Sequence, residues 1–412
     1  MQRDLPRFRS CQVRQVEQHS NDHSFTQPYR YIDSKSDLNK VLVELDAQSR
    51  FALDTEFHRE RTYWPEVSLL QIAWPGNVVV IDALAIDVGC LAPLMDSDKL
   101  VVLHAASQDL QALERVCDTI PQRIFDTQIA AGFIGCGVPS LASLYENELG
   151  LKLAKEQRLT DWLARPLSRT QLEYAANDVA HLLKIHDLFS VRLNELGRLG
   201  WVEAECRLLL EAHTANTWKP EEAWRKINGF RRLQGQAMAV GRSLAMWRQE
   251  RAANINRPIR HVMSDMAVVS ISMAMPTSKT KLAQVRGLNK SMLVGDLADG
   301  ILSSVDAGLK SKWRVPSRPH SSLSRKRIRP VVDLIAVWVR QLAEENQIEA
   351  SLLATRADIE TLVRGEDETR LAKGWRAEMI GEPIHQLMNG EAALAFDNDG
   401  VILERRSHCP VS

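Results

Sequence analysis

The segment Phe51-Ala52-Leu53-Asp54-Thr55-Glu56-Phe57 has the composition of a strand but carries two carboxylates. Five of its seven residues are apolar or β-branched, and the two acids, Asp54 and Glu56, stand one residue apart. Because side chains alternate along a strand, both acids point to the same face. Like charges on one face repel each other, so a strand that serves only the fold gains nothing from this pair.

Two interpretations of this pair are open at the level of the segment. A hard cation held between Asp54 and Glu56 would relieve their repulsion, because carboxylate oxygens are the ligands that Mg²⁺ and Mn²⁺ prefer. Alternatively, a strand ends here, with one solvated acid and one acid that caps a helix. A metal site would need further acids from elsewhere in the chain.

The composition is that of a globular protein with more than one domain. The chain has 412 residues, of which 45% are hydrophobic and 25% are charged, and this length predicts two or three domains. The net charge is zero, yet eight basic residues and no acid lie between Leu309 and Val332. A basic segment on an otherwise acidic chain points weakly to a polyanionic partner.

Cysteine spacing and hydropathy favour a reducing compartment. The six cysteines show no Cys-x-x-Cys spacing, which disfavours both a zinc site and a disulfide framework. No apolar run approaches the roughly 20 residues of a membrane span, and residues 1–28 contain no apolar core of the signal-peptide kind. We therefore expect a cytoplasmic protein that makes no contact with membranes.

Apolar runs on both sides of the acidic segment predict an α/β domain with a mixed sheet. Residues 68–74 and 78–81 are rich in β-formers and are separated by Pro75-Gly76-Asn77, which predicts a hairpin. With the acidic strand first, these runs would form a three-stranded antiparallel meander. The other expected elements are a strand at 31–33, a helix over 34–45, strands at 99–104 and 123–126, and helices from 127, over 140–149 and over 170–194.

Two further positions supply acids at suggestive places. Asp109 falls in the first turn of the helix that Ser107 is expected to cap, just beyond a strand end, where sites gather in α/β sheets. Tyr174 and Asp178 are four residues apart on a predicted helix and share one face. Each position also has a purely structural explanation, because a first-turn acid favours the helix dipole and a tyrosine can bond an aspartate at a helix surface.

Together, these acids and the tyrosine resemble the DEDD superfamily of 3′→5′ exonucleases, in the subgroup with a Tyr-x-x-x-Asp third motif. Within that subgroup the resemblance is greatest to the ribonuclease D family, and it extends over about residues 30–213. The other shared motifs are Asp54-Thr55-Glu56-Phe57, Thr62-Tyr63 with Pro65, Leu70-Gln71-Ile72, His104-Ala105, Phe125-Asp126-Thr127, and Asp161-Trp162 with Arg165-Pro166-Leu167.

The resemblance implies a ribonuclease-H-like mixed sheet and hydrolysis with two divalent ions, Mg²⁺ or Mn²⁺. By this resemblance Asp54 would bridge both ions, and Glu56 and Asp178 would complete one of them. Asp109 would hold the other ion largely through water, and Tyr174 would orient the attacking water. A tyrosine with a pKa near 10 is suited to positioning rather than to proton abstraction. The product would be a nucleoside 5′-monophosphate.

Residues beside these motifs are candidates for contact with substrate. They are Phe57, Gln71, His104, Lys155, Gln157, Arg158 and Arg165. The polar residues Lys155, Gln157, Arg158 and Arg165, which precede the third motif, could bind phosphates or form a solvated loop. We do not expect His58 or His104 to bind a metal, because hard-cation sites rarely use imidazole. Asp126 is expected to cap a helix.

The C-terminal half has helical patterns with few strand signals. The run from Trp247 to Ala252, together with Pro258, Asp265 and Pro276, resembles the HRDC domain, a small helical module. A second, more divergent HRDC-like bundle is expected after the basic segment. The predicted domains are a polar extension (1–28), the exonuclease domain (29–213), an HRDC domain (214–306), a basic linker (307–330), a second HRDC-like helical domain (331–395) and a tail (396–412).

Three functions are compatible with these features. The first is an exoribonuclease that trims the 3′ ends of structured RNAs, with transfer RNA precursors implied by the family and the helical bundles holding the substrate. The second is a 3′→5′ exonuclease acting on DNA. The third is an RNA-binding protein that no longer cuts, which the presence of all four acids and Tyr174 disfavours. RNA and DNA differ at the 2′-hydroxyl, whose contacts the motifs do not locate, and the oligomeric state is left open.

Overall fold

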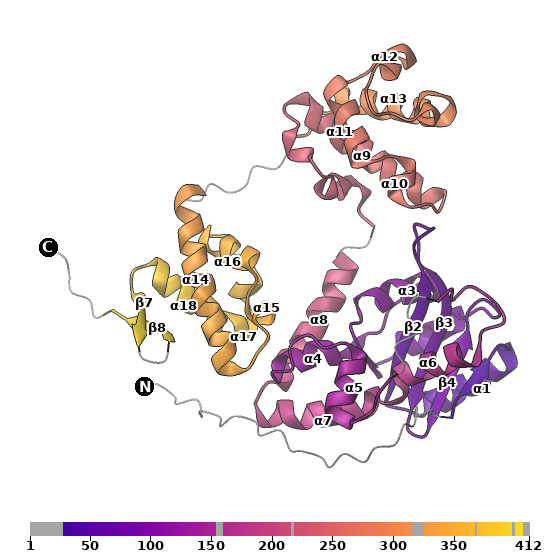
Figure 1. The fold of residues 1–412 in the computed structure, drawn as a ribbon, viewed down its shortest axis with the longest axis vertical. Helices are drawn as coiled ribbons and strands as arrows, with labels where there is room; N and C mark the ends of the chain where they lie inside the picture. The colour runs from indigo at the N-terminus through magenta and orange to yellow at the C-terminus, as the bar shows by residue number, and fades with distance from the viewer. Residues whose placement is uncertain are drawn as a thin grey trace.

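The computed structural model describes residues 28–153, 160–215, 218–314, 325–366, 369–397 and 400–406. An α/β domain at the N-terminal end is followed by a helical domain that contains α9 to α13 and by a second helical domain that begins with α14 (Figure 1). The predicted fold class is confirmed. The predicted extension at 1–28 lies almost entirely outside the described residues. No helix of the described ranges is long and apolar enough to cross a membrane.

The N-terminal domain is built on a six-stranded mixed sheet with the strand order β1-β4-β3-β2-β5-β6. The strands are β1 (Arg30–Ile32), β2 (Arg50–His58), β3 (Glu66–Trp74), β4 (Asn77–Asp82), β5 (Leu100–Leu103) and β6 (Arg123–Asp126). Strands β2, β3 and β4 form the predicted antiparallel meander, and the outer strands pair in parallel. The acidic strand β2 is therefore central.

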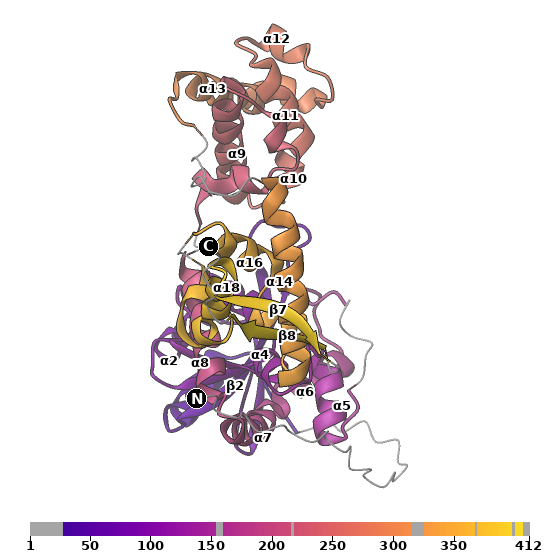
Figure 2. The ribbon, with the colours of Figure 1, turned by 90° about the vertical axis from the view of Figure 1, so that its left-hand side faces the viewer.

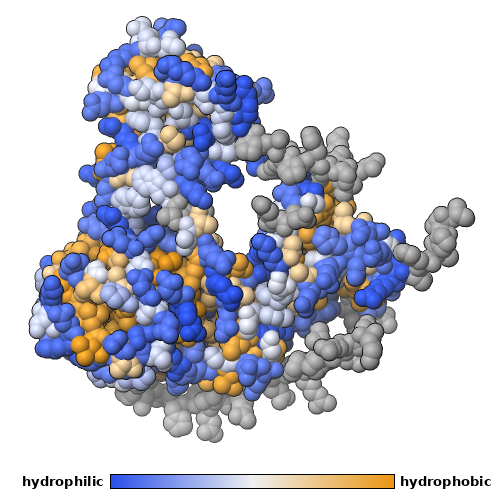
Figure 3. All heavy atoms as spheres, turned by 180° about the vertical axis from the view of Figure 1, so that it is seen from behind, coloured by the Kyte–Doolittle hydropathy of each residue, from blue (hydrophilic) through white to orange (hydrophobic). Residues whose placement is uncertain are grey.

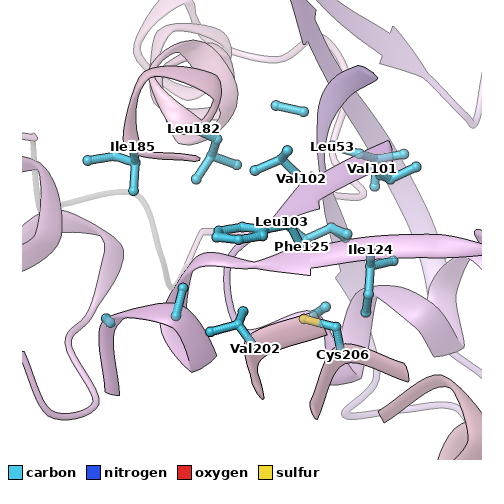
Figure 4. Packing of buried hydrophobic residues seen from close by; sticks show 14 of the residues in the cluster. Leu53, Val101, Val102, Leu103, Ile124, Phe125, Leu182, Ile185, Val202 and Cys206 are labelled. Carbon is cyan, nitrogen blue, oxygen red and sulfur yellow. The ribbon is translucent and has the colours of Figure 1, made fainter. Parts of the chain in front are cut away.

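Helices cover both faces of this sheet. They are α1 (Lys35–Asp46), α2 (Ala92–Met95), α3 (Ser107–Cys117), α4 (Thr127–Phe133), α5 (Leu141–Leu149), α6 (Arg169–Ala180), α7 (Leu182–Glu195) and α8 (Leu199–Ala215). Figure 4 shows Leu182 and Ile185 of α7 on one side of β5 and β6, with Val202 and Cys206 of α8 on the other. Burial on both faces explains why these strands read as continuous apolar runs.

The single helix expected over 170–194 is divided in two. Ser168 caps its start as part of a capping box with Gln171, but α6 ends at Ala180 and α7 begins at Leu182. The intervening His181 has φ −117° and ψ 2°, outside the helical region, and its ring packs edge-on against Tyr145 at 5.4 Å between centroids. The break depends on this tertiary contact, and neither proline nor glycine marks it in the sequence.

The first helical domain has a core of its own. Its elements are η2 (Pro220–Lys226), η3 (Phe230–Arg232), α9 (Gln236–Asn254), α10 (Ile259–Val262), α11 (Asp265–Ala274), α12 (Lys279–Ala283), η4 (Lys290–Leu293) and α13 (Gly295–Lys310). Helices α9 and α13 approach closely at Gly308, where an added Cβ would lie 2.4 Å from the Cα atom of Val240. Only a glycine allows this contact between the two backbones.

The second helical domain differs from its predicted bounds at both ends. Its elements are α14 (Arg325–Asn346), α15 (Ala350–Leu353), α16 (Arg356–Val363), η5 (Arg370–Ala372), α17 (Gly374–Arg376), η6 (Ala377–Gly381), α18 (Glu382–Met388), β7 (Ala392–Asp397) and β8 (Gly400–Arg405). Helix α14 starts within the expected linker. It contains Pro330 in its first turns and continues through it, although proline usually ends or kinks a helix. The expected tail is wrong where it covers β7 and β8, because these strands form an antiparallel hairpin.

Both helical domains contact the N-terminal α/β domain. On the C-terminal side, Arg376 forms a buried ion pair with Glu205 of α8, and the ring of Trp375 stacks on that of Trp201 at 4.6 Å. On the other side, the side-chain oxygen of Asn256 accepts hydrogen bonds from the main-chain N–H groups at positions 63 and 64, both at 3.1 Å. Both helical domains therefore pack against the same α/β domain (Figure 2). Seen from behind, an open gap lies between the two helical domains (Figure 3).

Candidate active site

Three of the four predicted acids lie together where β2 meets α6. One carboxylate oxygen each from Asp54, Glu56 and Asp178 lies within 4.8 Å of the others. The first two acids share one face of β2, as alternation predicts, and α6 packs across β2, β3 and β4. The capping box at the start of α6 fixes where this helix begins, so it also fixes how Asp178 meets the strand.

The fourth acid, Asp109, is tied to the same strand by the residue between the other two. One Asp109 carboxylate oxygen accepts hydrogen bonds from the Thr55 main-chain N–H at 3.2 Å and from the Thr55 hydroxyl at 2.6 Å. Asp109 lies in the first turn of α3, as expected, and is buried. This role of Thr55 was not predicted from the sequence. The feature that could have indicated it is a hydroxyl residue between the two acids of the motif.

Asp126 is a helix cap, as predicted, and it also shapes the approach to Asp109. Its carboxylate accepts hydrogen bonds from Gln128 N at 2.8 Å and Ile129 N at 3.4 Å in the first turn of α4. The same carboxylate accepts from Ala105 N at 3.0 Å and Ala106 N at 2.9 Å. Ala105 has φ 60°, a strained value for alanine, and these bonds hold the turn that leads into α3.

Burial raises the pKa values of Asp54 and Asp109, and neighbouring carboxylates add to the shift. The pKa of Asp54 lies well above its ordinary range, because the carboxyl is buried and faces the charges of Asp109, Asp178 and Glu56. Burial raises the pKa of Asp109 to about 7, although the hydrogen bonds from Thr55 oppose the shift. Such a cluster disfavours its own ionisation unless a positive charge joins it. Its all-oxygen donor set fits hard divalent cations.

Two tyrosines belong to the site region. Tyr174 lies one turn before Asp178 on α6, with its ring centroid 6.0 Å from that of Trp162. Tyr145 of α5 is fully buried, and its hydroxyl donates a hydrogen bond to the main-chain carbonyl of Asp178 at 3.2 Å. Burial, followed by the charges of Asp178 and Asp54, raises the pKa of Tyr145 well above its usual value. No sequence motif pointed to Tyr145.

Gln71 and Phe57 lie on the strands of the site, in different settings. Gln71 stands directly opposite Asp54 in the β2–β3 pair, so the two side chains share one face. It is completely buried, and its amide atoms have no hydrogen-bond partner among the described residues. A side chain without exposed surface does not reach substrate in this structure, which corrects that assignment. Phe57 follows a register shift in β2 and is half-buried.

Arg165 is engaged within the protein. Its guanidinium forms an ion pair with Asp82, with Nε 2.6 Å and Nη2 2.7 Å from the two carboxylate oxygens. Nη1 donates to the carbonyls of Trp162 and Ala164, and Nη2 also donates to Ser68. Since every guanidinium nitrogen is in use, this structure gives Arg165 the role of a brace between β3, β4 and the segment before α6, and corrects its assignment to substrate.

The other candidates are either buried or outside the described residues. His104 is half-buried, and burial lowers its pKa. The Thr127 hydroxyl donates to the Leu103 carbonyl at 3.0 Å, and it therefore accepts a hydrogen bond from His104 Nδ1 at 2.9 Å. The three remaining candidates, Lys155, Gln157 and Arg158, lie outside the described residues.

Comparisons with known proteins agree with this geometry. A family model described as a 3′-5′ exonuclease matches residues 29–194, and an HRDC domain model matches residues 237–305. Ribonuclease D of Bartonella henselae is 32% identical over 92% of this chain and 94% of its own length. Ribonuclease D of Gluconacetobacter diazotrophicus is 33% identical over 90% and 95%.

A solved structure extends the likeness to the whole arrangement of domains. Escherichia coli RNase D, described as an exoribonuclease involved in structured RNA processing, is 30% identical and superposes with a TM-score of 0.78. The match covers 88% of this chain and 99% of that one, so it includes both helical domains as well as the α/β base.

Proposed function

Because the chain belongs to the ribonuclease D family of 3′→5′ exoribonucleases, we propose that it trims the 3′ ends of structured RNAs, transfer RNA precursors among them. The observation that supports this most directly is the convergence of the Asp54, Glu56 and Asp178 oxygens within 4.8 Å. Asp109 joins them through Thr55, so acids that are far apart in the sequence share one site.

The four acids would hold two divalent ions, Mg²⁺ or Mn²⁺. Asp54 would contribute to both ions, Glu56 and Asp178 to one, and Asp109 to the other. When bound, such ions supply a nucleophile at neutral pH and stabilise the attacking and leaving oxygens of an in-line displacement. DEDD exonucleases depend on divalent metal, and the acidic cluster offers the matching ligands.

The remaining residues of the site would position the reactants. Tyr174, one turn before Asp178, would orient the attacking water through its hydroxyl, with its ring held beside Trp162. Thr55 fixes Asp109, and Tyr145 fixes the main chain of Asp178. Phe57, at the open end of β2, is the site candidate that would meet the terminal nucleotide. Each cycle would release one nucleoside 5′-monophosphate.

The helical domains would hold the body of the RNA while its end is cut. Their contribution should be largely electrostatic and independent of sequence, because phosphates carry no base information.

We further propose the cytoplasm as the place of action. The described cysteines at 90, 117, 136 and 206 are all free thiols, which suits a reducing compartment.

Paired RNA and DNA oligonucleotides of one sequence, each labelled at the 5′ end, test this function. With Mg²⁺ or Mn²⁺, the RNA should shorten stepwise from its 3′ end and release 5′-monophosphates, while the DNA should be degraded far more slowly. A variant with Asp54→Asn serves as the inactive control. Preference for DNA would overturn the substrate assignment, and degradation of neither polymer would favour a non-cleaving RNA-binding protein.

A further inference from the structure

The first helical domain carries arginines stacked on tryptophans outside the segment that matches the HRDC model. That match covers residues 237–305, whereas Trp224 precedes it and Trp313 follows it. The two rings meet edge to face at 5.2 Å between centroids, and Trp224 is anchored on the buried Phe230 at 5.1 Å. The two segments that flank the HRDC match therefore come together in one place.

Two arginines lie over this pair of rings, one on each. Arg225 lies over the Trp224 ring at 5.4 Å, and Arg242 of α9 lies over the Trp313 ring at 5.2 Å. Four more cations, Lys226, Arg231, Arg232 and Lys312, lie within two residues of one of these rings or of Phe230 in the chain. We define the tryptophan surface as Trp224 and Trp313 with Arg225, Lys226, Arg231, Arg232, Arg242 and Lys312.

The charge of the tryptophan surface is largely uncompensated. Five of its six cations are exposed, and Arg242 is half-buried. Two exposed acids, Glu221 and Glu222, lie beside it, and Glu222 is 3.5 Å from Arg225. Among the described residues, no carboxylate forms an ion pair with Arg231, Arg232 or Arg242. A cluster of like charges without partners destabilises a surface unless a polyanion neutralises it.

We propose that the tryptophan surface binds the phosphate backbone of the RNA substrate, away from the nucleotide being cleaved; this rests on the proposed function. A guanidinium stacked on an indole is held in a fixed orientation, while its N–H edge stays available for bidentate contact with phosphate. Such preorganisation lowers the entropy cost of binding. Four of the six cations are arginines, which suits phosphate better than isolated lysines do.

The double variant Arg231→Ala/Arg232→Ala tests the proposal. Both side chains are exposed, so their removal should leave the fold intact. Binding is measured on the Asp54→Asn background, with a long structured RNA and with a short oligonucleotide of the same 3′ sequence. Binding of the long RNA should weaken on the order of tenfold, and the slope of log affinity against log salt should shrink by about 0.7 for each lost phosphate contact. Binding of the short oligonucleotide should stay unchanged.

The matched control removes two charges from the same domain, as Lys279→Ala/Lys281→Ala. Helix α12, which carries both lysines, lies at the far end of the domain from η2 in both views (Figures 1 and 2). Binding and salt slope equal to those of the control would overturn the proposal. An equal loss on long and short RNA would also overturn it, because the surface would then act through the cleavage site. If the proposed function itself is wrong, the unmodified protein will not cleave RNA, and this result is distinct from the binding results above.

Discussion

The hydroxyl of Tyr145 donates a hydrogen bond to the main-chain carbonyl of Asp178, at 3.2 Å. Helix α6 ends two residues later, at Ala180, and the last carbonyls of a helix lack partners within it. Tyr145 supplies one of the missing donors. The break between α6 and α7 is thus stabilised by a side chain from α5, and the acid on the last turn of α6 is held in place by it.

Removal of this hydroxyl, in Tyr145→Phe, should weaken metal binding and lower kcat while KM for RNA changes little. The variant leaves a buried carbonyl without its donor, which costs about 1–3 kcal/mol, and it loosens the turn that carries Asp178. Mn²⁺ affinity and the kinetic constants are the measurements. Tyr31→Phe is the matched control, since it loses a tyrosine hydroxyl bonded to Asp82, on β4, two strands from the acids of β2. Equal losses of Mn²⁺ affinity in both variants would contradict the positioning role.

The variant Asp54→Asn should abolish cleavage while it raises the thermal stability of the metal-free protein. Loss of several kcal/mol of transition-state stabilisation corresponds to a decrease of about 10³-fold or more in kcat. The stability gain follows because the half-buried Asp54 carboxyl faces the charges of three other carboxylates, and a neutral amide removes that repulsion. RNA binding should persist. Calorimetry without metal and single-turnover cleavage check both parts, and a variant that cuts at the normal rate would refute the metal assignment.

Metal affinity should rise with pH through the neutral range. The pKa of Asp109 is raised to about 7 without metal, so this carboxyl still holds a proton where free aspartates have lost theirs. Binding of a cation must displace the proton, and affinity therefore increases as pH passes 7. Mn²⁺ titrations at several pH values, in buffers of different ionisation enthalpy, measure the released protons. A pH-independent affinity would contradict this account.

The same shift predicts how the metal-free protein responds to pH. Because the folded state holds protons on Asp109 that the unfolded chain has lost, its stability should fall as pH rises from about 4 towards 7. Asp109→Asn should remove this part of the slope. Added Mn²⁺ should stabilise the unmodified protein most at the alkaline end, which thermal melts at fixed ionic strength can measure.

Arg165→Gln should destabilise the protein without altering catalysis by its folded fraction. Burial alone would raise the pKa of Asp82, but hydrogen bonds from Arg165 and Tyr31 hold it below its ordinary value. Arg165 is partly exposed, and its loss leaves the buried Asp82 carboxylate without this partner, which costs about 1–3 kcal/mol. A depressed pKa contributes stability above the unfolded value that is lost in acid, so the difference between variant and parent should shrink as pH falls below about 4. An increased KM with unchanged stability would instead indicate a phosphate contact.

The sequence was sufficient to predict those features of the fold that depend on residues close together in the chain. The alternation in β2, the hairpin around Pro75 and Gly76, and the caps at Ser168 and Asp126 all depend on residues a few positions apart. Each was therefore predictable. The hairpin of β7 and β8 also has a local signal in the sequence, because Asp397 and Gly400 pair where its strands meet.

By itself, the sequence determined the order of strands in the meander, because strand alternation and hairpin signals are local. The four acids with Tyr174 and the succession of domains were predicted from a family resemblance. Only the tertiary structure decided that Thr55 holds Asp109, that Arg165 pairs with Asp82, and that the helix breaks at His181. The hydrogen bonds behind these features join residues 33 to 83 positions apart. Their partners are selected by burial and hydrogen-bond demand in the folded core, which no local pattern encodes.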